Sequence, residues 1–197
     1  MNRGCAQNLR IIGGAFRNHS LQSPKGGKTR PTLAIMRKAV FDILQNKIKE
    51  TRFLDLYAGT GAMGLEALSR GASHATFVEA ERSALLCIEE NIQALKVESK
   101  CSLIRCDCFR ALKTWAKEKR SFDVVYADPP YAIASRVLQE LLAFFAAHPL
   151  LEEGGTLFLE EAIPQALQPE TLPLGSLRLI DTRSFSRSAL HQFLMTG

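Results

Sequence analysis

The stretch that decides the fold is FLDLYAGTGAMGLEALSRGA, residues Phe53 to Ala72. A short apolar run leads into three glycines, Gly59, Gly61 and Gly64, which are spaced as G-x-G-x-x-G, and a helix-like segment follows them. This order is typical of a strand, a tight turn and a helix that bind a nucleotide-containing cofactor. Glycines let the backbone approach such a ligand closely, but they do not identify it.

Two acidic residues near this turn indicate which cofactor it holds. Glu79 follows Gly61 by 18 residues and is placed to accept hydrogen bonds from a ribose diol, which NAD and S-adenosylmethionine both contain. Asp55 lies four residues before Gly59, inside the strand, where a dinucleotide enzyme usually has an apolar residue. A buried carboxylate needs a partner, and only S-adenosylmethionine has an ammonium group to offer. Asp55 therefore favours S-adenosylmethionine, with capping of the next loop as its alternative role.

Short β-like runs alternate with helix-like runs along the rest of the chain. This alternation predicts an α/β protein with a Rossmann-like, mostly parallel and doubly wound sheet. Two final runs, residues 177–181 and 190–195, predict an antiparallel pair that completes seven strands. The expected parallel strands are Phe53–Tyr57, Ala75–Glu79, Ser102–Arg105, Phe122–Ala127 and Thr156–Leu159, with helices beginning near Ala62, Ser83, Phe109 and Ser135.

A second motif, Asp128-Pro129-Pro130-Tyr131, ends the fourth of these strands. Prolines stop strands, so the motif could be a simple terminator. Taken together with the features of the glycine-rich turn, the motif favours methyl transfer to an exocyclic amine of a nucleobase. The Asp128 carboxylate and the Pro129 carbonyl can accept both N–H hydrogens of the amine, which directs its lone pair at a methyl-sulfonium. The Tyr131 ring can stack on an extruded base.

The first 52 residues are strongly basic: they hold 11 Lys and Arg against 2 acidic residues, and the rest of the chain holds 14 against 18, so the balances are +9 and −4. Such a segment favours a nucleic acid partner, with a solvated basic face as the alternative. Residues 9–12 and 16–21 predict a hairpin, and the apolar spacing from Thr32 predicts an amphipathic helix. We expect a basic arm over residues 1–31 and a catalytic domain over residues 32–197. The candidate RNA contacts are Arg10, Arg17, Lys28, Arg30 and Arg37.

Cysteine and hydropathy patterns argue against several other classes of protein. The five cysteines are odd in number and contain no C-x-x-C pair, which favours buried reduced thiols over disulfides or a zinc site. The longest apolar run, around Leu141 to Leu151, is shorter than the roughly 18 residues that a membrane span needs. The first residues lack the apolar core of a signal peptide. We therefore expect a cytoplasmic protein without a metal.

Several motifs together give the chain a resemblance to a known family. RIIGG, RPT, DLYAGTGAMGLEALSRGA, VEAE, EENIQAL and DPPY occur in this order from about Leu9 onward. They resemble the bacterial RsmD-type methyltransferases, which methylate the N2 amine of a guanine in small-subunit ribosomal RNA. The chain departs from the family pattern at Ala34, Ile35 and Lys38, and its closing turn, RSFSRSALHQF, lacks a Tyr-Gly pair.

The resemblance implies S-adenosylmethionine as methyl donor and 16S rRNA or the small ribosomal subunit as partner. We expect the protein to be a monomer. It places the cofactor against Asp55, Tyr57, Ala58, Gly59, Thr60, Gly61, Glu79, Asp107 and Cys108, and the target base against Asp128, Pro129, Pro130 and Tyr131.

Three alternatives stay open from the residues alone. A DNA or RNA methyltransferase acting on adenine N6 or cytosine N4 shares the Asp-Pro-Pro-Tyr motif. An NAD-dependent oxidoreductase explains the glycines but neither Asp55 nor this motif. A non-catalytic RNA-binding protein explains only the basic arm.

Overall fold

The computed structural model describes residues 5–24, 31–130, 134–162, 174–185 and 188–197. The chain forms two compact units, Met1–Cys108 and Phe109–Gly197. Within the described ranges, every helix is too short or too polar to span a lipid bilayer.

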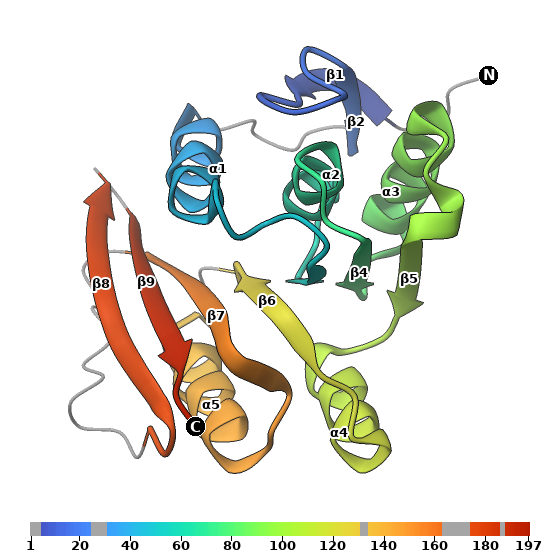
Figure 1. The fold of residues 1–197 in the computed structure, drawn as a ribbon. Helices are drawn as coiled ribbons and strands as arrows, with labels where there is room; N and C mark the ends of the chain where they lie inside the picture. The colour runs from blue at the N-terminus through green and yellow to red at the C-terminus, as the bar shows by residue number, and fades with distance from the viewer. Residues whose placement is uncertain (1–4, 25–30, 131–133, 163–173, 186–187) are drawn as a thin grey trace. The chain divides into compact units, whose positions relative to one another are not determined.

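Three parallel strands form the centre of the first unit, in the order β5-β4-β3 (Figure 1). β3 (Arg52–Leu56) pairs with β4 (His74–Glu79), and β4 pairs with β5 (Cys101–Arg105). Each strand begins within one residue of its predicted start. β3 and β4 carry four consecutive buried residues each, a pattern typical of strands that are covered on both faces.

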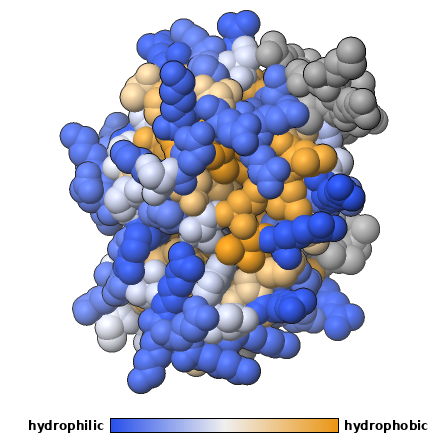
Figure 2. Space-filling view, turned by 90° about the vertical axis from the view of Figure 1, so that its right-hand side faces the viewer, coloured by the Kyte–Doolittle hydropathy of each residue, from blue (hydrophilic) through white to orange (hydrophobic). Residues whose placement is uncertain are grey.

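Helices α2 (Ala62–Ser69) and α3 (Arg82–Leu95) connect these strands, and a short 3₁₀ helix, η1 (Glu98–Lys100), precedes β5. β5 is the outer strand of the three, and four of its five residues are only half-buried. Figure 2 shows the side on which α3 and β5 lie, where apolar side chains gather between hydrophilic ones.

A hairpin and a helix precede the sheet. β1 (Cys5–Arg10) pairs antiparallel with β2 (Ser20–Pro24), and α1 (Pro31–Leu44) follows. The predicted hairpin and helix are confirmed, but the strands lie further from the turn than the sequence suggests. Residues 11–19 form a broad turn because Gly14 and Asn18 adopt left-handed φ angles of 77° and 70°.

The hairpin turn is bound to the end of α2 by Ser69. The Ser69 carbonyl accepts from the Ala15 N–H at 2.7 Å, and the Ser69 hydroxyl accepts from the Phe16 N–H at 2.9 Å. A Cβ on Gly14 would overlap the Ser69 carbonyl, so this close approach requires glycine. The hairpin therefore belongs to the first compact unit, Met1–Cys108.

The second unit contains β6 (Phe122–Ala127), α5 (Ala134–Ala147), β7 (Leu151–Ala162), β8 (Leu177–Phe185) and β9 (Ser188–Met195), with α4 (Cys108–Glu118) at its start. The strand order is β6-β7-β9-β8, parallel between β6 and β7 and antiparallel at the other two pairs. The predicted closing antiparallel pair is confirmed. β7 starts five residues before the predicted Thr156, because a bulge opposite Phe122 and Val124 accommodates Gly154-Gly155 within the strand.

One cysteine departs from the expectation of reduced thiols. Cys87 on α3 is disulfide-bonded, whereas Cys101, Cys106 and Cys108 are free. An odd cysteine count argues only against complete pairing, so it could not exclude a single bond.

Candidate functional site

The glycine-rich turn lies at the carboxyl end of β3. Tyr57, Gly59 and Gly61 all have left-handed φ angles, at 58°, 55° and 73°. The Gly61 N–H donates to the Ala58 carbonyl at 2.7 Å, which closes the turn in front of α2. A Cβ on Gly59 would meet no atom closer than the Tyr57 carbonyl oxygen at 3.9 Å. The backbone at Gly59 is therefore open to a ligand.

The other two glycines of the motif face inward. A Cβ on Gly61 would lie 3.3 Å from side-chain atoms of Ile88 and Phe77, and a Cβ on Gly64 would overlap the Phe77 ring. Gly64 thus lets α2 pack closely on β4.

Asp55 is 2% exposed and holds the start of α2 in place. Its Oδ2 accepts from the Gly64 N–H at 2.9 Å. A carboxylate is stabilised there by the unpaired N–H groups and the positive end of the helix dipole. The loop-capping role left open by the sequence is therefore observed, and any cofactor ammonium would be an additional partner of Asp55.

Glu79, half-buried at the end of β4, binds three backbone N–H groups. Its Oε2 accepts from Gly59 at 2.8 Å, and its Oε1 accepts from Ala80 and Glu81 at 2.8 Å each. A carboxylate offers about four lone-pair positions, so roughly one is left for a ligand hydroxyl. Glu79 couples the open glycine of the turn to the position where a ribose diol would bind.

Asn91 is a site residue that the sequence analysis missed. It is 1% exposed on α3, and its Nδ2 donates to the Thr60 carbonyl at 3.1 Å and to the Gln22 carbonyl at 3.0 Å. Its Oδ1 accepts from the Gln22 N–H at 2.6 Å. One side chain therefore ties the cofactor turn to the N-terminal hairpin. The sequence feature that could have revealed Asn91 is its position as a lone amide on the apolar face of α3.

Asp107 and Cys108 follow β5, as predicted. Asp107 is exposed, and Cys108 is 3% exposed at the start of α4. Burial raises the pKa of the Cys108 thiol to about 12, although a hydrogen bond with Tyr57 acts in the opposite direction. The thiol is therefore neutral at physiological pH, which excludes it as a thiolate nucleophile and suits a residue that contributes its backbone amide.

The residues of the turn fit S-adenosylmethionine. The open backbone at Gly59 admits a ligand, Glu79 retains an acceptor position for a ribose hydroxyl, and Asp55 supplies negative charge. Among the residues with described positions, no three His, Cys, Asp or Glu side chains come together as metal ligands.

The Asp-Pro-Pro-Tyr motif belongs to the second unit. Asp128 is half-buried directly after β6, Pro129 is buried and Pro130 is exposed. Tyr131 lies outside the described residues, so its predicted stacking role stays a prediction.

Buried polar side chains gather near the end of β7, whose Leu159 pairs with Ala127, the residue before Asp128. The Tyr126 hydroxyl donates to Glu160 Oε2 at 2.6 Å. His191 Nε2 lies 3.1 Å from Glu161 Oε2, with both side chains at most 3% exposed. These residues support the strand end that carries Asp128. The sequence signal was a pair of carboxylates at the end of an apolar strand.

The predicted RNA contacts divide into three groups. Arg10 and Arg17 are exposed, and Lys28 and Arg30 lie outside the described residues. Arg37 is 2% exposed, and its Nη2 donates to the Arg10 carbonyl at 2.6 Å, while its Nε lies 3.6 Å from Glu66 Oε2. The prediction that Arg37 contacts RNA is therefore wrong, because its guanidinium binds the Arg10 carbonyl and lies beside Glu66 inside the protein.

Comparisons with known proteins find matches over most of the chain. A family model described as Conserved hypothetical protein 95 matches residues 9–193. YlbH of Bacillus subtilis (strain 168), named as a candidate rRNA methyltransferase, is 34% identical over 164 residues, which cover 83% of this chain and 88% of YlbH. Ribosomal RNA small subunit methyltransferase D of Escherichia coli (strain K12) is 30% identical over 166 residues, which cover 84% and 81% of the two chains.

Comparison with solved structures supports the predicted fold. The structure of yhhF from Escherichia coli, named as a candidate methyltransferase, matches with a TM-score of 0.81 and 25% identity over 97% of this chain and 99% of that one. The predicted fold class, a Rossmann-like methyltransferase fold with a mostly parallel sheet, is confirmed.

Proposed function

The chain belongs to the Conserved hypothetical protein 95 family, and from this premise we propose that it transfers a methyl group from S-adenosylmethionine to the N2 amine of a guanine in 16S rRNA. The observation that carries the proposal is the glycine-rich turn, which is open at Gly59 and flanked by the carboxylates of Asp55 and Glu79. The name of the Escherichia coli relative and the RsmD-like motifs support the small-subunit rRNA as substrate.

In the proposed mechanism, the residues of the turn bind and orient the cofactor. Glu79 accepts from a ribose hydroxyl while it holds the Gly59 amide. Asp55 offers charge to an ammonium while it holds the first turn of α2. Asp107 and the Cys108 amide would bind the adenine edge. When bound, S-adenosylmethionine supplies an electrophilic methyl group on a sulfonium.

The Asp-Pro-Pro-Tyr motif prepares the amine. The lone pair of a guanine N2 is delocalised into the ring, so the amine is a weak nucleophile. Asp128 and the Pro129 carbonyl each accept one N–H, which favours a tetrahedral nitrogen with its lone pair free to attack. Two consecutive prolines restrict the backbone that presents this carbonyl, so positioning makes a large contribution.

We further propose that the enzyme acts in the cytoplasm, as a monomer, on 16S rRNA or on an assembling small subunit. The exposed Arg10 and Arg17 and the excess charge of +9 over the first 52 residues support an RNA partner.

Isothermal titration calorimetry of the purified protein with S-adenosylmethionine and with NAD tests the cofactor assignment. We expect saturable binding of S-adenosylmethionine and no detectable binding of NAD. The opposite pattern would refute the proposed function.

Replacing Asp55 with alanine should weaken S-adenosylmethionine binding by about 5- to 150-fold, on the order of 1 to 3 kcal/mol, because a charge-assisted hydrogen bond is lost. The change also frees the Gly64 N–H, so Asp55→Asn is the matched control: its amide oxygen can still accept from Gly64. If both variants bind the cofactor as wild type does, Asp55 is only a cap for α2.

Neutralising Arg10 and Arg17 with glutamine should raise KM for RNA and leave cofactor affinity unchanged, because both side chains are exposed on the hairpin. The salt dependence of RNA binding should flatten by about 0.7 to 0.9 of a slope unit for each lost phosphate contact. Filter binding at several salt concentrations measures both quantities. A slope equal to that of wild type would exclude phosphate contacts by these two residues.

A further inference from the structure

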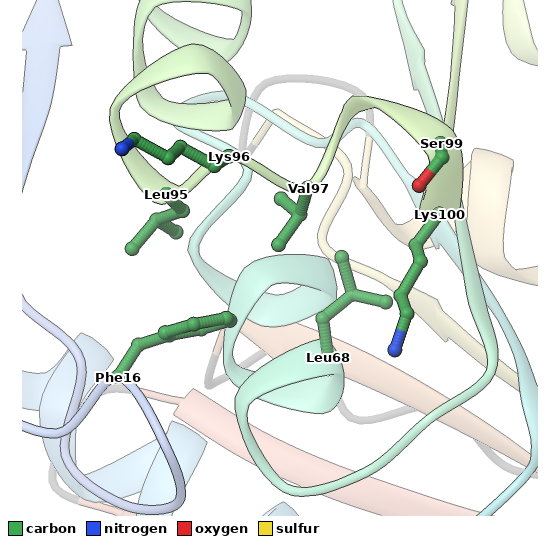
Figure 3. A pocket seen from close by; sticks show the side chains of 7 residues that line it. All are labelled: Phe16, Leu68, Leu95, Lys96, Val97, Ser99 and Lys100. Carbon is green, nitrogen blue, oxygen red and sulfur yellow. The ribbon is translucent and has the colours of Figure 1, made fainter.

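A pocket of about 230 Å³ lies in the first unit and is not part of the glycine-rich turn (Figure 3). Its lining comes from three places in the sequence: the hairpin turn, the last turn of α2, and the segment from the end of α3 through η1. None of the residues proposed to bind the cofactor lines it.

The walls of the pocket are apolar and include one aromatic ring. The Phe16 ring points toward the space below Leu95 and Val97, and Leu68 of α2 faces the same space (Figure 3). Phe16 is half-buried, so part of its surface is available to a ligand. An accessible ring beside an apolar wall is suited to stacking of a flat, unpaired base.

The rim of the pocket is cationic. Lys96 and Lys100 line it and are exposed, and Arg17, which follows Phe16 directly, is exposed as well. Glu98 is the acidic residue between the two lysines, so these four side chains carry a net charge of +2. An aromatic wall with a positive rim is the combination by which proteins bind single-stranded nucleic acid.

The pocket is held in place by backbone contacts. Ser69 fixes the backbone of Phe16 through a 2.9 Å hydrogen bond. Lys96 ends α3 in a left-handed conformation with φ 56°, and the Lys100 N–H donates to the Val97 carbonyl at 2.9 Å. A ligand would therefore bind without a large ordering cost for the pocket backbone.

We infer that this pocket binds an unpaired nucleotide of the RNA substrate, with the Phe16 ring stacked on the base and Lys96 and Lys100 contacting the flanking phosphates. The inference rests on the proposed function and adds an RNA contact that is separate from the target guanine. Leu68 lies at the end of α2 opposite to the glycine-rich turn, and eight helical residues span about 12 Å. The pocket therefore lies away from the cofactor turn and contributes to affinity for RNA.

Two pairs of variants test the inference, with a fluorescein-labelled single-stranded RNA oligonucleotide of mixed sequence as the probe. Phe16→Ala should weaken binding about tenfold, and Phe16→Tyr, which keeps the ring, should bind nearly as wild type does. Lys96→Gln with Lys100→Gln should weaken binding and flatten the salt dependence by about 1.4 slope units. The matched control, Lys113→Gln with Lys117→Gln on α4, removes the same charge from exposed positions outside the pocket.

The pocket is not an RNA site if Phe16→Ala and the Lys96/Lys100 variant bind the probe as wild type does, or if the Lys113/Lys117 control loses as much affinity. The inference is also wrong if the pocket variants lose methyl transfer only to protein-containing subunits, because the occupant is then a protein. Methyl transfer to RNA by the wild type is measured in parallel. Its absence refutes the proposed function, whereas normal transfer with unaffected pocket variants refutes the pocket alone.

Discussion

Replacing Asp128 with alanine lowers kcat for RNA methylation by about 100-fold or more and leaves S-adenosylmethionine binding nearly unchanged. The reason is that the carboxylate acts on the amine mainly in the transition state, where one preorganised hydrogen-bonding group is commonly worth this factor. Cofactor affinity is retained because Asp128 is not among the proposed cofactor contacts, which run from Asp55 to Cys108. Single-turnover kinetics with labelled cofactor, together with calorimetry, measure the two effects separately.

Asp128→Asn is the matched control, because its amide oxygen still accepts one hydrogen bond without the charge. Its activity should fall less than that of the alanine variant. Tyr131→Phe keeps the stacking ring and should stay largely active, whereas Tyr131→Ala should lose capture of the base. Wild-type kcat in Asp128→Ala would mean that the two prolines only terminate a strand.

The largest expected effect on stability comes from Glu66, a fully buried carboxylate on α2. Its Oε1 accepts from Arg70 Nε at 2.7 Å, and its Oε2 accepts from the Ile12 N–H at 2.8 Å and lies 3.6 Å from Arg37 Nε. Glu66→Ala removes the negative charge from a buried guanidinium and should reduce the free energy of unfolding by about 3 to 5 kcal/mol. Urea denaturation followed by circular dichroism measures this change.

The control for the pair of Glu66 and Arg70 is a surface ion pair whose two residues are also four positions apart. Lys38 and Asp42 form an i,i+4 pair on α1 with side chains 68% and 52% exposed. Asp42→Ala should change the free energy of unfolding by only about 0.5 kcal/mol, because solvent screens exposed pairs. Equal losses for Glu66→Ala and Asp42→Ala would contradict a structural role for the buried network.

The parallel strands and the glycine-rich turn could be predicted because local patterns determine them. Mostly apolar runs of five or six residues predicted the bounds of β3, β4 and β6 to within one residue, and the glycine spacing identified the turn. The start of β7 was not predicted correctly, since Gly154-Gly155 resembles a turn. The strand continues through these glycines because it pairs with β6. Tertiary pairing there overrides the local signal.

Roles that depend on long-range contacts could not be predicted. From the sequence, Arg37 is one more cation of the basic first 52 residues, and only the position of Glu66, 29 residues later, shows why it is buried. Asn91 joins Thr60 to Gln22, residues that lie 31 and 69 positions away. Asp55 illustrates a third case, in which both interpretations of one carboxylate, cap and ligand partner, are compatible with its 2.9 Å contact to Gly64.

The most direct test of the proposed function is to incubate the protein with methyl-labelled S-adenosylmethionine and ribosomal RNA, and then to digest the RNA and identify the labelled nucleoside. We predict N2-methylguanosine in the small-subunit RNA and no label in DNA. Label in N6-methyladenine or N4-methylcytosine would show that the Asp-Pro-Pro-Tyr motif serves a different base. Label in neither RNA nor DNA would contradict the assignment of the protein as a nucleic acid methyltransferase.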